Sequence, residues 1–78
     1  MNVKSYGYVL FYSTSSALRT EKLAKILNIP IKLVPAPRQL SSDCGVCIRF
    51  ELENEESVRE LLTKNNIEYS SIHLNIKA

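Results

Sequence analysis

The sequence contains no tryptophan, only two glycines, and no apolar run approaching the roughly 18 residues that cross a membrane. We therefore expect no membrane span. The start of the chain also lacks the apolar stretch of a secretory signal, so the expected location is the cytoplasm. Internal repeats, low-complexity tracts and linkers are missing too, which predicts one domain over residues 1–78. With 45% hydrophobic and 23% charged residues, the composition is typical of a folded domain.

Metal ligands are scarce as well. Two cysteines and one histidine do not supply the four ligands of a usual structural zinc or iron–sulfur site. We expect no metal and no cofactor in one protomer, and a four-cysteine site shared across a homodimer stays an alternative. In a reducing compartment, two closely spaced cysteines indicate reactive or metal-binding thiols rather than a structural disulfide.

Charge is unevenly distributed along the chain although the net charge is only +2. Residues 1–40 hold six basic residues and one acidic residue, whereas residues 41–78 hold four basic and seven acidic residues. This asymmetry would suit docking to a protein partner or a nucleic acid. Two ordinary solvated helices of opposite charge explain it more simply.

Hydrophobic periodicity predicts six elements in the order β-α-β-β-α-β. The expected strands cover residues 8–12, 31–34, 46–52 and 67–76. One helix follows the hydroxyl-rich stretch 13–16 and ends near Asn28, and a second is capped by Asn54 and ends near Lys64. The apolar face of the first helix is expected to consist of Ala17, Leu18, Leu23, Ala24, Ile26 and Leu27.

Strand alternation predicts which side chains share a face of the sheet. In the third strand, Val46, Ile48, Phe50 and Leu52 should face the helices, with Cys47, Arg49 and Glu51 on the other face. In the last strand, Ile72, Leu74 and Ile76 should share one face.

The element order favours an α+β, ferredoxin-like βαββαβ sandwich, with two helices on one face of a four-stranded antiparallel sheet. Right-handed crossovers place the third strand antiparallel between the first two. The end of the first strand, the start of the first helix and the loop before the third strand then meet at one edge. Cys44 should therefore lie near the helix N-terminus, with His73 at the far edge, which argues against a Cys–His nucleophile pair.

That edge has features that activate a thiol. A helix N-terminus and a nearby Arg38 would favour the thiolate of Cys44, whereas the adjacent Asp43 would oppose it unless it caps the turn. Gly45 allows a positive φ or a close approach of a ligand. Hydroxyl groups that could help to hold a small anion come from Ser13, Thr14, Ser15, Ser16, Ser41 and Ser42. Serine, aspartate and glycine are also ordinary turn formers, which is the simpler interpretation for each of them alone.

Two further interpretations concern Cys47 and nucleic acids. In an extended strand Cys47 would stand about 10 Å from Cys44, too far for a disulfide, unless the chain still turns through Gly45. It is therefore either a plain strand residue or a resolving thiol. Tyr8 or Tyr12 on the open sheet face, with nearby cations, would suit RNA, but the glycine and aromatic pattern of RNA-binding sheets is missing from the third strand. Nucleic acid is disfavoured as a partner.

Residues 11–22 read FYSTSSALRTEK, and residues 29–45 read IPIKLVPAPRQLSSDCG. These stretches resemble the F-x-S-T-x-x-A-L-x-x-E-K opening and the I-P-x-x-L-x-P-x-P-R-x-L-S-S-D-C-G core of the selenium/sulfur carrier-like family of small bacterial proteins. The second motif is specific, the likeness runs over nearly the whole chain, and the last third agrees only in general character.

The resemblance implies a carrier that holds sulfur or selenium as a persulfide or selenosulfide on Cys44. The loop around it would be shaped by Ser41, Ser42, Asp43 and Gly45. The implied partners are a cysteine desulfurase, a selenium-utilising enzyme or a sulfurtransferase-like protein, with the chain as an accessory carrier rather than a stand-alone enzyme. The position of Cys47 varies in that family, so a second thiol here would be a local addition.

Two other classes of function stay open at this point. One is a non-catalytic protein-interaction module in which the cysteines are incidental. The other is a thiol-redox or metal-binding protein that works through Cys44 and Cys47. The choice between sulfur and selenium, the donor and the acceptor, and the oligomeric state are open as well.

Overall fold

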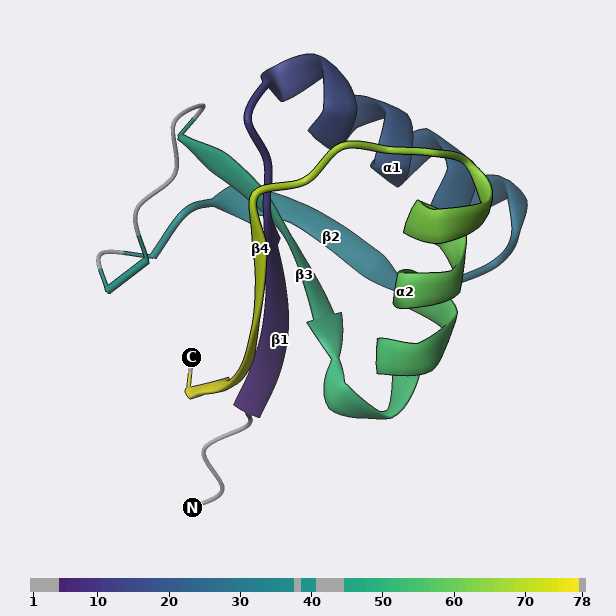
Figure 1. The fold of residues 1–78 in the computed structure, drawn as a ribbon. Helices are drawn as coiled ribbons and strands as arrows, with labels where there is room; N and C mark the ends of the chain where they lie inside the picture. Colours follow the sequence, from purple (N-terminus) through teal and green to yellow (C-terminus); the bar gives the residue numbers. More distant parts are fainter. Residues whose placement is uncertain (1–4, 38, 41–44, 78) are drawn as a thin grey trace.

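The computed structural model describes residues 5–37, 39–40 and 45–77. The elements over these residues are β1 (Ser5–Leu10), α1 (Thr14–Ile26), β2 (Ile31–Pro35), β3 (Val46–Glu51), the short 3-10 turn η1 (Leu52–Asn54), α2 (Glu55–Lys64) and β4 (Ser71–Lys77). The element order confirms the β-α-β-β-α-β prediction (Figure 1). Within the described part of the chain, neither helix combines the length and apolarity that a membrane span requires.

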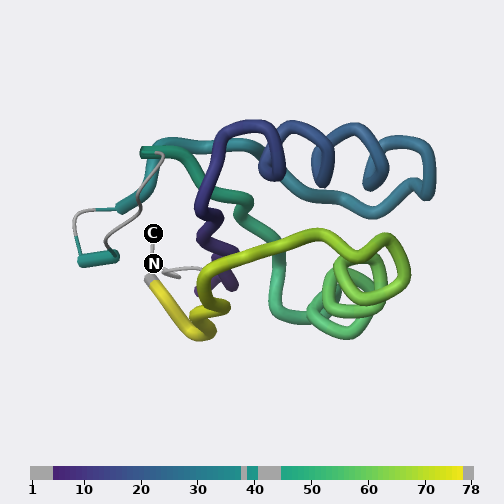
Figure 2. Tube along the Cα trace, turned by 45° about the horizontal axis from the view of Figure 1, so that its top comes forward, coloured from purple at the N-terminus to yellow at the C-terminus, as the bar shows by residue number. Residues whose placement is uncertain are grey.

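The four strands form one sheet in the order β2-β3-β1-β4, and every neighbouring pair is antiparallel. Strand β3 lies between β1 and β2, as right-handed crossovers predict. Both helices pack on the same face of the sheet, which Figure 2 shows from a second direction. The architecture is therefore the α+β sandwich expected from the sequence, with a ferredoxin-like topology.

The main core lies between this face and the helices. Strand alternation places Val9, Ile48 and Phe50 in it, together with buried residues of both helices. Gly7 pairs directly with Phe50 across the strands, and a Cβ at position 7 would overlap the Phe50 ring. The missing side chain of Gly7 thus leaves the space that the aromatic ring fills.

The buried face of α1 is made of small residues. Ala17, Thr20 and Ala24, at helical spacing, are its buried side chains. The predicted apolar face was wrong in part, because three of its large members are exposed: Leu18 (48%), Ile26 (67%) and Leu27 (55%). The hydroxyl of Thr20 donates to the Ser16 carbonyl at 2.8 Å, so this polar residue is accommodated in the core.

The opposite face of the sheet has a smaller core of its own. Tyr8 and Leu10 of β1 pack there with Cys47 of β3 and with Leu40 from the β2–β3 connection. The predicted placement of Cys47 on the face away from the helices is confirmed. This second core makes both faces of the sheet apolar near the end of β1.

Strand β4 departs from the predicted alternation. Its register against β1 shifts between Tyr6 and Tyr8, and Asn75 has a φ of 60°. One extra residue in a strand reverses the side chains that follow it. Ile72 and Leu74 therefore pack toward the helices, whereas Ile76 packs into the second core, contrary to the prediction that all three share a face.

The two glycines provide a matched test of the core. Gly7→Ala should lower the free energy of unfolding by about 2–3 kcal/mol, because the added methyl displaces the Phe50 ring. Gly45→Ala should cost only about 1 kcal/mol, since position 45 has a φ of 75° and no atom lies within 4 Å of an added Cβ. Urea denaturation measures both values, and an equal or smaller loss for Gly7→Ala would contradict this packing.

Candidate functional site

Five elements meet at the edge of the sheet where β1 ends. Leu10, the last residue of β1, pairs with Cys47 near the start of β3 and with Ser71 at the start of β4. Cys47 in turn pairs with Val34 near the end of β2. Helix α1 begins four residues after Leu10, so its N-terminus leaves from the same edge. Figure 1 shows the coloured, described part of the β2–β3 connection on the side of the sheet away from both helices.

The described parts of that connection are held at three points. The Ala36 backbone N–H donates to the Gly45 carbonyl at 3.1 Å, which closes the base of the loop. The Leu40 N–H donates to the Pro37 carbonyl at 3.0 Å, as in a four-residue turn. The Leu40 side chain is buried in the second core. The described residues of the connection are thus closed at the base by the Ala36–Gly45 hydrogen bond and attached to the sheet by the Leu40 side chain.

Several predicted site residues lie outside the described residues: Arg38, Ser41, Ser42, Asp43 and Cys44. The residues that flank this segment are described. Leu40 precedes Ser41, and Gly45 follows Cys44 with the positive φ of 75° that the sequence made available. Proximity of Cys44 to the start of α1 stays a prediction.

The N-terminus of α1 is capped by Ser13, the first residue of the hydroxyl-rich stretch 13–16. Its backbone is extended, and its Oγ accepts from the Ser16 N–H at 3.3 Å and lies 3.3 Å from the Ser16 Oγ. Ser13, Thr14 and Ser15 are exposed. The first turn carries no acidic residue, so no carboxylate there offsets the positive end of the helix dipole. An anion at this end would be stabilised by free N–H groups.

Cys47 has no exposed surface. Its Sγ lies 3.9 Å from the Pro35 carbonyl oxygen, the geometry of a weak S–H···O contact. Leu10, Leu40 and Tyr8 surround it on the open face of the sheet. A thiol in such surroundings acts as a small packing group, and a reagent or a second thiol reaches it only when the residues packed around it move apart.

His73 lies elsewhere than the sequence predicted. It is the third residue of β4 and pairs with Tyr8, so it lies two positions from the edge that carries Cys47, not at the far edge. The prediction was wrong because it began the last strand at residue 67 instead of Ser71. The Ser71 hydroxyl and the His73 Nε2 are 2.9 Å apart. Sequence reasoning missed Ser71, although its i,i+2 spacing from His73 places both on one face of a strand.

The rest of the open face carries cations and aromatics. The Arg49 guanidinium lies 4.4 Å from the centre of the Tyr6 ring, a cation–π contact. Lys32 is directly opposite Arg49 on β2. Tyr8 is only 4% exposed, so this ring offers no free surface for stacking a base. Across the described residues, no three or more His, Cys, Asp or Glu side chains form a group that could hold a metal ion.

Comparison with known proteins gives one family and one relative. The family described as "Putative Se/S carrier protein-like" matches residues 6–74. An uncharacterized protein of Methanocaldococcus jannaschii is 29% identical over 66 residues, which cover 85% of this chain. The chain spans 33% of the length of that relative. No solved structure matches the chain.

The role of Leu40 as the loop's anchor is testable through Cys47. In a Cys44→Ser background, where Cys47 is the only thiol, Leu40→Ala should raise the rate of reaction with a disulfide reagent about tenfold or more. The reason is that losing this buried side chain lowers the free energy of opening the loop away from Cys47 by about 2 kcal/mol. Gln39→Ala, at the exposed neighbouring position, is the control. Equal rates in the two variants would show that Leu40 does not cover Cys47.

Proposed function

This chain belongs to the family described as "Putative Se/S carrier protein-like", and from that premise we propose that it carries sulfur or selenium on Cys44 in the cytoplasm. The main support for this proposal is the family match, which covers residues 6–74 and so includes the segment between Leu40 and Gly45. The structure supports the proposal because both residues that flank the Cys44 segment are tied to the sheet, Leu40 by burial and Gly45 by its hydrogen bond to Ala36. Functional residues are commonly found in connecting segments whose ends are positioned by a rigid scaffold.

Loading is a sulfur transfer between thiols. The Cys44 thiolate attacks the outer sulfur of a persulfide on the donor protein. A new S–S bond forms on Cys44, the donor's S–S bond breaks, and the donor leaves as a thiolate. The transfer needs no external oxidant or reductant, because one persulfide and one thiolate become another persulfide and another thiolate. Selenium would follow the same course from a donor selenosulfide.

The surrounding groups serve the charged species. The N-terminus of α1 has a positive dipole end and no acidic residue in its first turn, so it favours an anion at this edge. In the proposed site it stabilises the thiolate and the persulfide of Cys44, together with Arg38 and the loop N–H groups. Because Cys47 is fully buried, we assign the acceptor role to Cys44 alone. Release by a Cys44–Cys47 disulfide would require Leu40 to leave the second core.

The partners in this proposal are proteins: a cysteine desulfurase or selenium-utilising enzyme as donor, and a sulfurtransferase-like protein as acceptor. The chain then acts as an accessory carrier rather than as a stand-alone enzyme. The family membership and the exposed edge of the sheet support delivery between proteins. A pure interaction module is the competing function, and it differs in needing no cysteine.

Intact-mass spectrometry tests the carrier function. Reduced protein incubated with a cysteine desulfurase and cysteine should gain about one sulfur atom, and the gain should disappear on treatment with a reductant. Cys44→Ser should abolish the gain because it removes the acceptor. Cys47→Ser is the matched control and should keep it, provided that its circular dichroism shows a folded protein.

The outcomes separate the candidate functions. A gain that survives in Cys44→Ser would contradict the assignment of the acceptor thiol. No gain from either a persulfide or a selenosulfide donor would argue for the interaction module, in which Cys44→Ser keeps partner binding.

A further inference from the structure

The outward face of α1 is not explained by the fold. Leu18, Lys22 and Ile26 lie at i, i+4 and i+8, so they share one face of the helix, and all three are exposed. This face is opposite the small buried stripe of Ala17, Thr20 and Ala24. The large apolar side chains of α1 therefore point away from the core. Such side chains at regular spacing, with a cation between them, are typical of a surface that meets a partner.

The face of α1 around Lys22 is basic. Arg19 and Lys25 are three residues from Lys22 on either side, and all three cations are exposed. Like charges at this spacing repel one another. Among the described residues, the ion pairs are Arg59 with Glu55 and Lys64 with Glu60, both within α2, so none reaches α1. Among the described residues, no ion pair joins these three cations to an acidic side chain, and Glu21 is the one acidic residue of α1.

The complementary surface is present on the same chain. On α2, Glu56 and Glu60 lie at i and i+4, are exposed and face away from the buried stripe of Val58, Leu61 and Leu62. The pairing of Glu60 with Lys64 is a solvent-exposed contact at 3.3 Å, which contributes little. The helix layer therefore presents a basic, partly apolar helix beside an acidic one.

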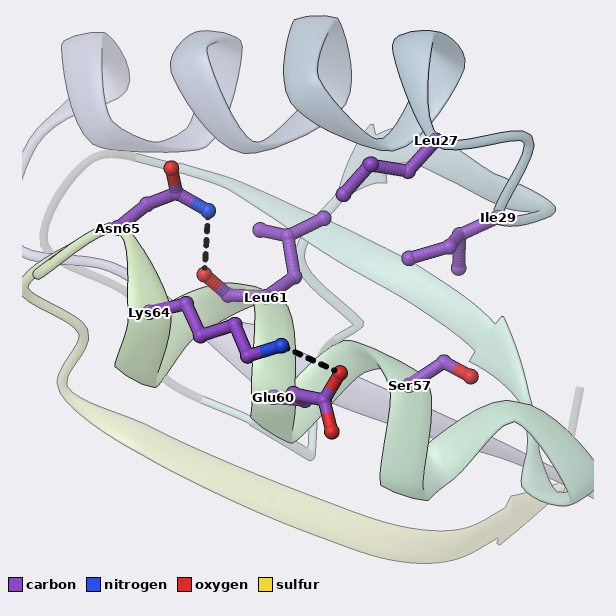
Figure 3. A pocket seen from close by; sticks show the side chains of 7 residues that line it. All are labelled: Leu27, Ile29, Ser57, Glu60, Leu61, Lys64 and Asn65. Carbon is purple, nitrogen blue, oxygen red and sulfur yellow. Dashed lines mark hydrogen bonds and ion pairs between the residues drawn. The ribbon is translucent and has the colours of Figure 1, made fainter.

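A groove of about 310 Å³ separates the two helices at the C-terminal end of α1. Figure 3 shows Leu27 and Leu61 facing each other across it, with Ile29 nearby and the Glu60–Lys64 pair on the α2 side. Leu27 is 55% exposed although it lines this groove, so the apolar surface there is only partly covered within one protomer. A second apolar surface laid over the groove would remove it from water.

We propose that the helix layer is the interface of a twofold-symmetric homodimer, in which α1 of one protomer lies against α2 of the second copy. A twofold axis produces the same α1–α2 contact twice. Lys22 therefore meets the partner's Glu56, and Glu56 meets the partner's Lys22. The exposed Leu18 and Ile26 supply apolar contacts between the charged pairs. The open sheet face stays free in this arrangement, because it is on the other side of the sheet from the helices.

This dimer is held by few charged contacts and a limited apolar area. We therefore expect a dissociation constant in the micromolar range that weakens as salt is raised from 20 to 500 mM, as screening predicts. The charge reversals Lys22→Glu and Glu56→Lys should each weaken it about tenfold or more, since each substitution places two repulsive contacts across the axis.

Sedimentation velocity on the full chain, at several concentrations and at low salt, measures these constants. The decisive sample is an equal mixture of the Lys22→Glu and Glu56→Lys proteins. Each variant alone is predominantly monomeric, but the mixture should dimerise with nearly the wild-type constant, because opposite charges again meet at both contacts. Lys32→Glu, an exposed reversal on the opposite face of the sheet, is the control and should leave the constant unchanged.

The outcomes are distinct from those of sulfur loading, which needs only Cys44. A wild-type monomer up to about 1 mM at low salt overturns the proposal and assigns the α1 face to a different, acidic partner. A dimer that is unaffected by Lys22→Glu, or a mixture that fails to restore dimerisation, also overturns it. Thermal unfolding followed by circular dichroism confirms that every variant is folded before its association is interpreted.

Discussion

Side chains along β1 and β3 alternate between the two faces of the sheet, and both faces are apolar near the end of β1. The rest of the structure depends on the need to cover both faces. On one face Val9, Ile48 and Phe50 are covered by the helices. On the other, Leu10 and Cys47 would be in water if nothing covered them. Leu40, from the β2–β3 connection, is buried against these two residues and helps to cover them. The connection that contains the proposed acceptor Cys44 is thereby attached to the sheet at Leu40 by ordinary hydrophobic burial.

This arrangement separates two roles for cysteine within one short stretch. Cys47 is part of the sheet, where a small, polarisable side chain fills the space under Leu40. Cys44 is in the connection, between two residues whose positions are fixed. The same edge carries the capped N-terminus of α1, whose first turn has no acidic residue. Of the two cysteines, the structure describes Cys47, and its burial leaves Cys44 as the proposed acceptor.

Strand alternation and element order predicted most of the fold, because both follow from local geometry. The position of β3, the face of Cys47 and the shared edge were all expected. The errors have physical causes as well. Sequence hydrophobicity assigned Leu18 and Ile26 to the core, but the close packing of α1 on the sheet uses small residues instead. The bulge around Asn75, which moved Ile76, and the late start of β4, which moved His73, depend on tertiary pairing and have no local signal. Cys44 was identified by a motif, and no pattern of hydrophobicity would have distinguished it from a turn residue.

Peptide mapping of the wild-type protein tests the central claim, that Cys44 rather than Cys47 holds the cargo. The protein is loaded from a persulfide donor, alkylated and cut after Arg38 and Arg49, which places both cysteines in one peptide covering residues 39–49. Fragmentation of that peptide should locate the additional sulfur on Cys44, with Cys47 carrying only the alkyl group of an ordinary thiol. Additional sulfur on Cys47, or none on either residue after loading, would contradict the account.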